Sequence, residues 1–478
     1  MLFRSSGKTE VYCALIREVI RRGQQTLVLV PEIALTSQLA ARFEARFPGR
    51  VVVLHGQLTP NQRVQRWYAI ANKQYDVIIG PRSAVFAPLQ SLGLIVVDEE
   101  HDASYKSDVS LRYNARDTAL MYAKQTQCPI VLGSATPSLE LYAASTEGRM
   151  QRLELPERVD ATLQHIPRPP IRIIDLKQEA TIDPHGLIGT TLAERIESHR
   201  AARHHVLLLL NRRGSISARI CRHCSATERC PSCSTPFVIH MRNQIAIGVC
   251  HLCGKNSYVN SHCSECFHME FLNIGSGTQR VYDVARARWP HAHIIRWDGD
   301  SADRVRDYER MLDEINASPS AIIIGTQMIA KGFDIPNIRL VGVVNTDTSL
   351  HMPDVRAAER TYQLLTQVAG RAGRRAGDAE VIFQTYKPEH YAIQAAARYD
   401  SELFYTQELQ YRKRMQYPPY ARLIKLTWQH ANPTLCESHA HQESQHIQTL
   451  LEQYHNTTRI IGDRKSTRLN SSHANISY

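Results

Sequence analysis

Four residues near the start of the chain, Ser6-Gly7-Lys8-Thr9, have the types and spacing of a phosphate-binding loop. In such a loop the backbone amides surround the phosphates, the Lys8 ammonium lies between the β- and γ-phosphates, and the Thr9 hydroxyl binds magnesium. The helix that begins there adds the positive end of its dipole. The complete motif has a glycine where Leu2 stands, so this short version needs support from elsewhere in the chain.

That support comes from Asp98-Glu99-Glu100-His101, which directly follows the apolar run LGLIVV. Such a run is typical of a buried parallel strand, and its end places the carboxylates at the edge of the sheet where phosphates bind. Asp98 can hold a magnesium ion there, and Glu99 can orient or deprotonate an attacking water. The alternative, an acidic loop that caps a helix, does not explain the phosphate-binding motif. The two motifs together predict a site for ATP and Mg²⁺.

Two arginines late in the chain, Arg371 and Arg374, stand three residues apart in the run QVAGRAGR, which begins at Gln367. This spacing brings both guanidinium groups close to one face of a helix. A planar guanidinium can stabilise the charge that develops on the γ-phosphoryl oxygens. Taken alone, the run could equally be a basic loop. If it lies in a second lobe, hydrolysis depends on closing the crevice between the lobes.

Most of the cysteines form Cys-x-x-Cys pairs. The pairs are Cys221 and Cys224, Cys230 and Cys233, Cys250 and Cys253, and Cys263 and Cys266. Zinc prefers tetrahedral sulfur sites, so these thiolates predict two closed structural zinc sites per chain, without an open catalytic position. Disulfides are the alternative, but a reducing compartment disfavours them and the regular spacing does not require them.

The elements that must position these residues are short apolar strands with helices between them. The apolar runs form two series: TLVLVPE, VVVLHG, DVIIGPRS, LGLIVVDEE and PIVLGSAT, then VLLLLNRRG, AIIIGTQM and LVGVVNTD. Between them we expect helices such as EVYCALIREVIRRG, which should end at Gly23. The apolar positions of this helix are Val11, Leu15, Val19 and Ile20. Alternating strands and helices predict an α/β fold with doubly wound parallel sheets.

A proline-rich stretch, residues 156–170, separates the two series and predicts two lobes with a ligand site in the crevice between them. The cysteine-rich segment interrupts the second series as a small inserted domain. We expect a nucleotide-binding lobe in 1–160, a linker and the start of the second lobe in 161–220, the zinc-binding insertion in 221–270, the rest of the second lobe in 271–398, a small C-terminal domain in 399–462, and a disordered or non-native tail in 463–478.

The composition is that of a folded globular chain: 478 residues, 43% of them hydrophobic, with a formal net charge of +11. No apolar run approaches the ~20 residues of a membrane span, and the first residues lack a secretory signal. We therefore expect no membrane contact and a cytoplasmic location. The positive charge favours a partner rich in phosphates, such as a nucleic acid, but it is also typical of a solvated basic face.

The motifs SGKT, PEIALTSQ, GPRSAVFAP, DEEH, GSATPSLE, GTQMIAKGFD and QVAGRAGR stand in this order along the chain. They resemble the superfamily-two helicases, and with the cysteine insertion they resemble the bacterial primosomal replication-restart helicases over residues 5–462. The resemblance implies two RecA-like lobes and an ATP-dependent, 3′-to-5′ DNA helicase. Such an enzyme acts at stalled forks and recombination intermediates and helps to load the replicative helicase.

The same resemblance implies the roles of individual residues. Nucleotide and magnesium are bound by Gly7, Lys8, Thr9, Asp98 and Gln367. Catalysis is assigned to Lys8, Asp98, Glu99, Arg371 and Arg374. Thr326 and Gln327 match the motif that contacts the DNA backbone and couples it to ATP. For the zinc sites the resemblance favours nesting, with Cys221, Cys224, Cys263 and Cys266 on one ion and Cys230, Cys233, Cys250 and Cys253 on the other.

A segment after the acidic motif resembles the aromatic-rich loop of the family. It offers rings on which bases can stack and cations for phosphates, at Tyr105, Lys106, Arg112, Tyr113 and Arg116. The alternative is a solvated loop with two core tyrosines. The partners that the resemblance implies are forked, branched and single-stranded DNA, primosome proteins and single-stranded DNA-binding protein, with the chain itself a monomer.

The chain also departs from the family pattern. The family carries DNA-binding domains before the motor, including one that holds a 3′ end and a winged helix, whereas here the phosphate loop begins at residue six. We therefore expect an N-terminally truncated chain. This leaves a second hypothesis open, a truncated and ATPase-impaired module that binds DNA and primosome proteins through its zinc insertion. A third hypothesis is another translocase of the superfamily that acts on RNA or branched DNA, although the cysteine insertion argues against it.

Overall fold

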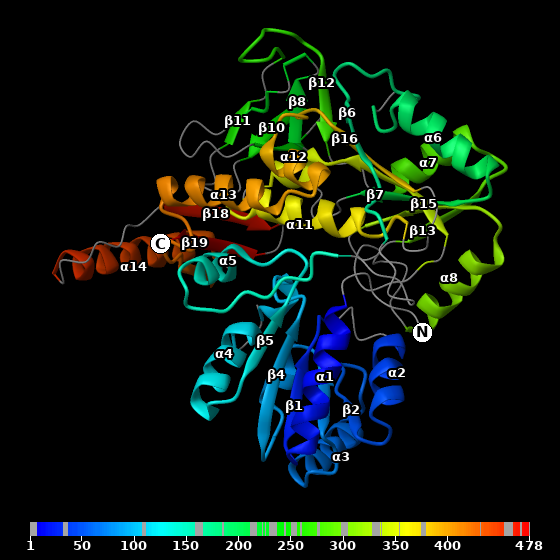
Figure 1. Cartoon of the computed structure of the whole chain (residues 1–478). Coiled ribbons are helices and arrows are strands. Elements are labelled where there is room, and N and C mark those ends of the chain that lie inside the picture. Colours follow the sequence, from blue (N-terminus) through cyan, green and yellow to red (C-terminus); the bar gives the residue numbers. More distant parts are fainter. Residues whose placement is uncertain are drawn as a thin grey trace.

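The computed structural model describes two α/β lobes, a cysteine-rich insertion and a C-terminal unit (Figure 1). It describes the chain except for residues 1–6, 32–36, 108–110, 158–165, 184–185, 211–217, 222, 225, 229–236, 243–244, 250–255, 259–260, 275–277, 298–304, 327–334, 336, 353, 374–378, 431, 454–461, 469–470 and 478. Within these described residues, no helix has both the length and the hydropathy to cross a bilayer.

The first lobe is built on a parallel sheet in the order β2-β3-β1-β4-β5. The strands are β1 (Gln25–Leu29), β2 (Val51–Val53), β3 (Val77–Gly80), β4 (Leu92–Asp98) and β5 (Ile130–Gly133). The helices are α1 (Lys8–Arg21), α2 (Ser37–Arg46), α3 (Pro60–Ala71), α4 (Ala115–Thr126) and α5 (Leu139–Thr146). Every residue of β1 and β3 is buried, because helices cover both faces of the sheet. The predicted strands of the first series are therefore confirmed, and β4 ends at the acidic motif.

Helix α1 ends where the sequence predicts, since Gly23 follows it with a φ of +68°. Of the apolar positions named from the sequence, Val19 is buried and Ile20 is partly buried against the core. Val11 and Leu15 are exposed. The buried residues are Tyr12, Cys13, Ile16 and Val19. Both sets recur at helical spacing, because this helix carries apolar residues on more than one side, and only the contact with the sheet selects between them.

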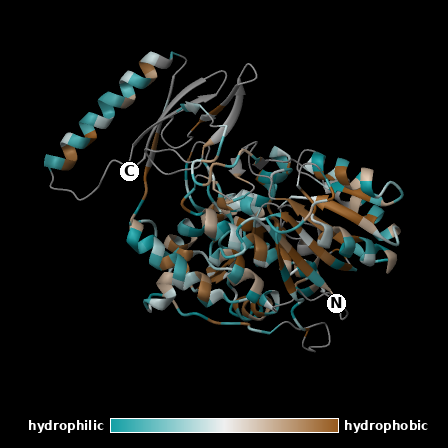
Figure 2. Cartoon of the chain, turned by 90° about the horizontal axis from the view of Figure 1, so that it is seen from above, coloured by the Kyte–Doolittle hydropathy of each residue, from teal (hydrophilic) through white to brown (hydrophobic). Residues whose placement is uncertain are grey.

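The second lobe is built on a parallel sheet in the order β13-β14-β7-β15-β16-β6. Its strands are β6 (Ile171–Asp175), β7 (His205–Leu210), β13 (His293–Trp297), β14 (Ala321–Gly325), β15 (Ile338–Asn345) and β16 (Glu380–Thr385). Its helices are α6 (Thr190–Ala201), α7 (Thr278–Arg288), α8 (Val305–Ala317), α10 (Asp347–Leu350), α11 (Ala357–Ala369) and α12 (Tyr391–Arg398). Figure 2 shows hydrophobic strands inside the molecule and mostly hydrophilic helices outside. The two lobes thus have the doubly wound α/β architecture that the sequence predicts.

The insertion lies between β7 and α7 and contains short antiparallel strands. They are β8 (Ala218–Cys221), β9 (Val238–Arg242), β10 (Ile245–Val249), β11 (Asn256–Tyr258) and β12 (Phe271–Ile274). Strands β8 and β12 pair with each other, so the chain enters and leaves the insertion along one two-stranded ribbon.

The C-terminal unit consists of two long helices and an antiparallel sheet in the order β17-β19-β18. Its elements are α13 (Ser401–Met415), β17 (Lys425–His430), α14 (Pro433–Gln453), β18 (Gly462–Arg468) and β19 (Ser471–Ser477). The expectation of a disordered or non-native tail over residues 463–478 needs correction in its first alternative, because β18 and β19 lie there, and the second alternative stays a prediction. Strand β19 forms backbone ladders with both β17 and β18, and such hydrogen bonds leave no apolar pattern in the sequence.

Candidate functional site

The phosphate-binding motif and the acidic motif meet at the end of β4, although 91 positions separate Lys8 from Glu99. Lys8 Nζ lies 2.7 Å from Glu99 Oε1 and 3.8 Å from Asp98 Oδ1. Gly7 caps α1 with a φ of +74°, a left-handed conformation that glycine adopts without strain. Thr9 is the second residue of α1, at the same positive helix end. The structure therefore brings together the predicted nucleotide-binding residues of the first lobe.

Two buried tyrosines hold Asp98 in place. The Tyr12 hydroxyl donates to Asp98 Oδ1 at 3.1 Å, and the Tyr105 hydroxyl donates to the Asp98 carbonyl oxygen at 2.5 Å. Burial, and then the charge of Asp98, raise the pKa of both hydroxyls well above its ordinary value, so both remain neutral donors. Sequence reasoning missed Tyr12, although its position four residues after Lys8 places it on the same helix face.

His101 links the acidic motif to the second lobe. Its Nδ1 lies 2.6 Å from Ser134 Oγ, in the loop after β5, and its Nε2 lies 2.7 Å from the Gln367 side-chain nitrogen on α11. An amide nitrogen can only donate, so Nε2 accepts and Nδ1 carries the proton toward Ser134. Gln367 thus reaches the acidic motif from the other lobe, and the His101 imidazole connects this motif to the second lobe.

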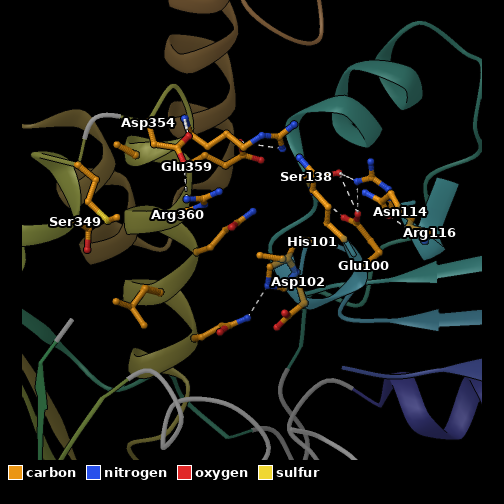
Figure 3. A pocket seen from close by; sticks show the side chains of 18 residues that line it. Glu100, His101, Asp102, Asn114, Arg116, Ser138, Ser349, Asp354, Glu359 and Arg360 are labelled. Carbon is orange, nitrogen blue, oxygen red and sulfur yellow. Dashed lines mark hydrogen bonds and ion pairs between the residues drawn. The ribbon is translucent and has the colours of Figure 1, made fainter. Parts of the chain in front are cut away.

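A cavity of about 230 Å³ lies between the lobes next to this contact (Figure 3). From the first lobe, Glu100 faces it and accepts hydrogen bonds from the Ser138 backbone and hydroxyl and from Arg116. From the second lobe, Asp354 and Arg360 face it as an ion pair with an N–O separation of 2.6 Å. Charged groups of both signs therefore line the crevice, and Glu100, Asp354 and Arg360 each have a partner on their own lobe.

Helix α13 of the C-terminal unit contacts both lobes. The Tyr405 hydroxyl donates to the Pro137 carbonyl at 2.6 Å, and its ring stacks on Tyr142 with centroids 3.9 Å apart. The fully buried Arg412 pairs with Glu359 of α11 at 3.3 Å. Glu359, which is 2% exposed, also accepts from the backbone N–H of Leu139 in the first lobe. Sequence reasoning missed this junction, because more than 200 positions separate Leu139 from Glu359.

In the segment predicted to bind DNA, some residues pack or pair within the protein and others are exposed to solvent. Tyr105 is 1% exposed and lies in the core, so the prediction that its ring stacks on bases is not met in this structure. Tyr113 packs edge-on against Phe86, with centroids 5.0 Å apart. Arg116 donates to Glu100 and to Ser138. The exposed cations of the segment are Lys106 and Arg112. For the tyrosines, the alternative of core residues in a solvated loop is thus closer to the structure.

The remaining motor residues lie in the second lobe. Thr326 is buried and follows β14, at the carboxyl end of the sheet. Arg371 follows the end of α11, four residues after Gln367. Gln327 and Arg374 lie outside the described residues. Gln367 is therefore the residue of this group that the structure places against the acidic motif.

Four of the predicted zinc ligands converge. The sulfur atoms of Cys221, Cys224, Cys263 and Cys266 all lie within 4.8 Å of one another. The Sγ atoms of Cys221 and Cys266 are 3.5 Å apart, as are those of Cys224 and Cys263. Tetrahedral zinc, with Zn–S bonds of about 2.3 Å, requires sulfur separations of about 3.8 Å, so this donor set fits the ion. Cys230, Cys233, Cys250 and Cys253 lie outside the described residues.

Comparison with known families agrees with the two lobes. The family model described as DEAD/DEAH box helicase matches residues 4–144, and the one described as helicase conserved C-terminal domain matches residues 274–376. The first match contains Lys8 and the acidic motif, and the second contains Gln367 and Arg371. The chain belongs to the superfamily-two helicases.

Within that class, the chain is a relative of the replication restart protein PriA. It is 41% identical to PriA of Bacillus subtilis (strain 168) over 89% of its length, and 40% identical to PriA of Treponema pallidum (strain Nichols) over 88%. The alignments cover 52% and 63% of those relatives, so the chain spans between half and two thirds of their length. Among solved structures, the helicase MrfA bound to DNA has a TM-score of 0.46 and 13% identity, covering 84% of this chain and 45% of that one.

Proposed function

We propose that the chain is the ATP-driven motor of a DNA helicase that acts in replication restart. The observation that carries the proposal is the meeting of Lys8 with Asp98 and Glu99, at a sheet edge that His101 connects to the second lobe. A cation, two carboxylates and a helix N-terminus at one point form a site for a magnesium-bound triphosphate.

The residues fit ATP and Mg²⁺ by their chemistry. Gly7 and the first amides of α1 would hold the phosphates, and Thr9 and Asp98 supply the oxygen ligands that magnesium prefers. Bound magnesium would neutralise the phosphate charge. Lys8 now pairs with Glu99, and it would exchange this partner for a phosphate. That exchange would release Glu99 to orient the attacking water, while arginines of the second lobe would approach as the crevice closes.

DNA is the proposed track, because the relatives are replication restart proteins and the chain carries a net charge of +11. The exposed Lys106 and Arg112 would contact phosphates near the crevice. From the resemblance we infer 3′-to-5′ movement, forked or branched DNA as substrate, and primosome proteins and single-stranded DNA-binding protein as partners. We further propose two zinc ions per chain, with the second on the remaining four cysteines.

The test is to measure ATP hydrolysis by the chain and by Lys8→Ala, with and without forked DNA. We expect DNA to stimulate the parent chain and Lys8→Ala to remain at background. Equal background rates in all four samples would contradict the motor and favour the hypothesis of a binding module. Single-stranded RNA serves as a further arm, since stronger stimulation by RNA than by DNA would indicate a different translocase of the superfamily.

A further inference from the structure

Tyr12 belongs to α1 but lies beyond the phosphate-binding motif. It is one helical turn after Lys8 and buried, and its hydroxyl donates to Asp98 Oδ1 at 3.1 Å. Lys8 Nζ approaches the same oxygen at 3.8 Å. One oxygen of Asp98, Oδ1, is thus held on the side of α1.

Gly133 leaves space for this hydroxyl. It is the residue paired with Asp98 across β4 and β5, and a Cβ at this position would lie 1.6 Å from Tyr12 Oη. Any larger side chain would therefore displace the tyrosine tip from Asp98. A phenylalanine would fill the same core, and a buried hydroxyl costs free energy unless it is hydrogen-bonded. Packing alone does not require the Tyr12 hydroxyl, so we attribute its presence to the hydrogen bond with the Asp98 carboxylate.

We propose that Tyr12 is a positioning residue that orients the Asp98 carboxylate for the magnesium ion of the ATP site. The inference rests on the proposed function, because it concerns the metal of that site. Since Oδ1 is already held, Asp98 needs no reorientation when the metal arrives. The hydrogen bond therefore contributes to metal affinity, and its loss should weaken metal binding more than it slows hydrolysis at saturating metal.

The test compares Tyr12→Phe with the parent chain in two titrations. Electron paramagnetic resonance measures Mn²⁺ binding in the presence of ADP, and ATP hydrolysis is measured against Mg²⁺ concentration. We expect both half-saturating concentrations to rise about tenfold, the effect of one hydrogen bond to a charged group. Gly133→Ala keeps the hydroxyl but displaces it, so it should give a similar rise. Tyr122→Phe removes a hydroxyl from a partly buried tyrosine elsewhere in the lobe and serves as the matched control.

The outcomes separate this inference from the proposed function. If Tyr12→Phe has the half-saturating Mn²⁺ and Mg²⁺ concentrations of the parent chain, whatever its thermal stability, Tyr12 has only a packing role and the inference is overturned. If the parent chain shows no ADP-dependent Mn²⁺ binding, the proposed ATP site is overturned and the inference with it.

Discussion

Replacing Arg412 by methionine tests whether the charged junction between the lobes stabilises the fold. Arg412 is fully buried on α13, and it pairs with Glu408 at 2.7 Å and with Glu359 at 3.3 Å. Arg412→Met keeps much of the side-chain length but leaves both carboxylates without this partner. Removing one partner of a buried ion pair typically lowers the free energy of unfolding by about 3–5 kcal/mol, because the charge of the other partner stays buried without that compensation.

The same change should make the loss of stability depend on pH. Burial raises the pKa of Glu359 above its ordinary value of 4.5, and the charges of Arg356 and, to a smaller extent, Arg412 oppose that rise. In Arg412→Met the folded-state pKa of Glu359 therefore rises further. A carboxyl with a raised folded pKa holds its proton more tightly in the folded state, so its contribution to stability is present at low pH and lost as the pH rises through that pKa. We expect Arg412→Met to be closer to the parent chain at pH 5 than at pH 8.

Urea unfolding followed by tryptophan fluorescence measures this effect, because Trp289 and Trp297 are buried in the second lobe. The matched control is Arg414→Met, an exposed arginine of the same helix, which should change the free energy of unfolding by less than about 0.5 kcal/mol. If Arg412→Met lost less than about 1 kcal/mol at pH 8, or lost the same amount at both pH values, the junction would not depend on the buried charge as argued.

Three further changes test other parts of the structure. His390 caps α12 by accepting from the Ala392 N–H, and its burial, followed by the charge of Lys387, lowers its pKa from 6.5 to about 4. Stability should therefore fall by about 1–3 kcal/mol as the pH drops from about 6.5 towards 4. His390→Asn keeps a hydrogen-bond acceptor at the cap, so the free energy of unfolding measured in urea should depend less on pH in this variant. An unchanged pH dependence would mean that His390 does not cause the loss of stability. Removing zinc with a chelator should release about two ions per chain and unfold the insertion while fluorescent-nucleotide binding persists, and metal analysis showing one ion or none would contradict the assignment. Gln367→Ala removes the contact to His101, and we expect a fall of about tenfold in the DNA-stimulated ATPase rate, larger than the fall in the basal rate. Equal falls in both rates would mean that this contact does not couple the lobes.

Much of the fold could be predicted because buried parallel strands leave a strong pattern. The apolar runs of the first series are the strands of the first sheet, including its edge strands β2 and β5, and the runs of the second series are the neighbouring strands β14, β7 and β15 inside the second sheet. The strands that sequence reasoning did not name include β6 and β13. Both lie at edges of the second sheet and contain exposed and partly exposed residues beside buried ones, so their apolar runs are broken.

The site could be predicted only in part, because motifs name residue types but not contacts. Lys8, Asp98 and Glu99 meet as expected, since the topology of a parallel sheet places their motifs at one edge. The face of α1, the burial of Tyr105 and the role of Glu359 depend on packing between distant segments. Tyr105 shows the limit clearly: an aromatic residue beside cations suggests a base-binding loop, yet its hydroxyl bonds to the backbone of Asp98 in the core.

The contacts at the junction indicate how a change at the nucleotide site would reach the C-terminal unit. Ser134, which contacts His101, and Pro137, which accepts from Tyr405, belong to the same short loop after β5. A rearrangement of the acidic motif that moves His101 must act on this loop, and the loop contacts α13 directly. Because α13 also contacts α11 through Arg412, this helix is attached to both lobes. If the crevice opens during the proposed ATPase cycle, these contacts would have to slide or break, and their free energy would affect how readily the lobes separate.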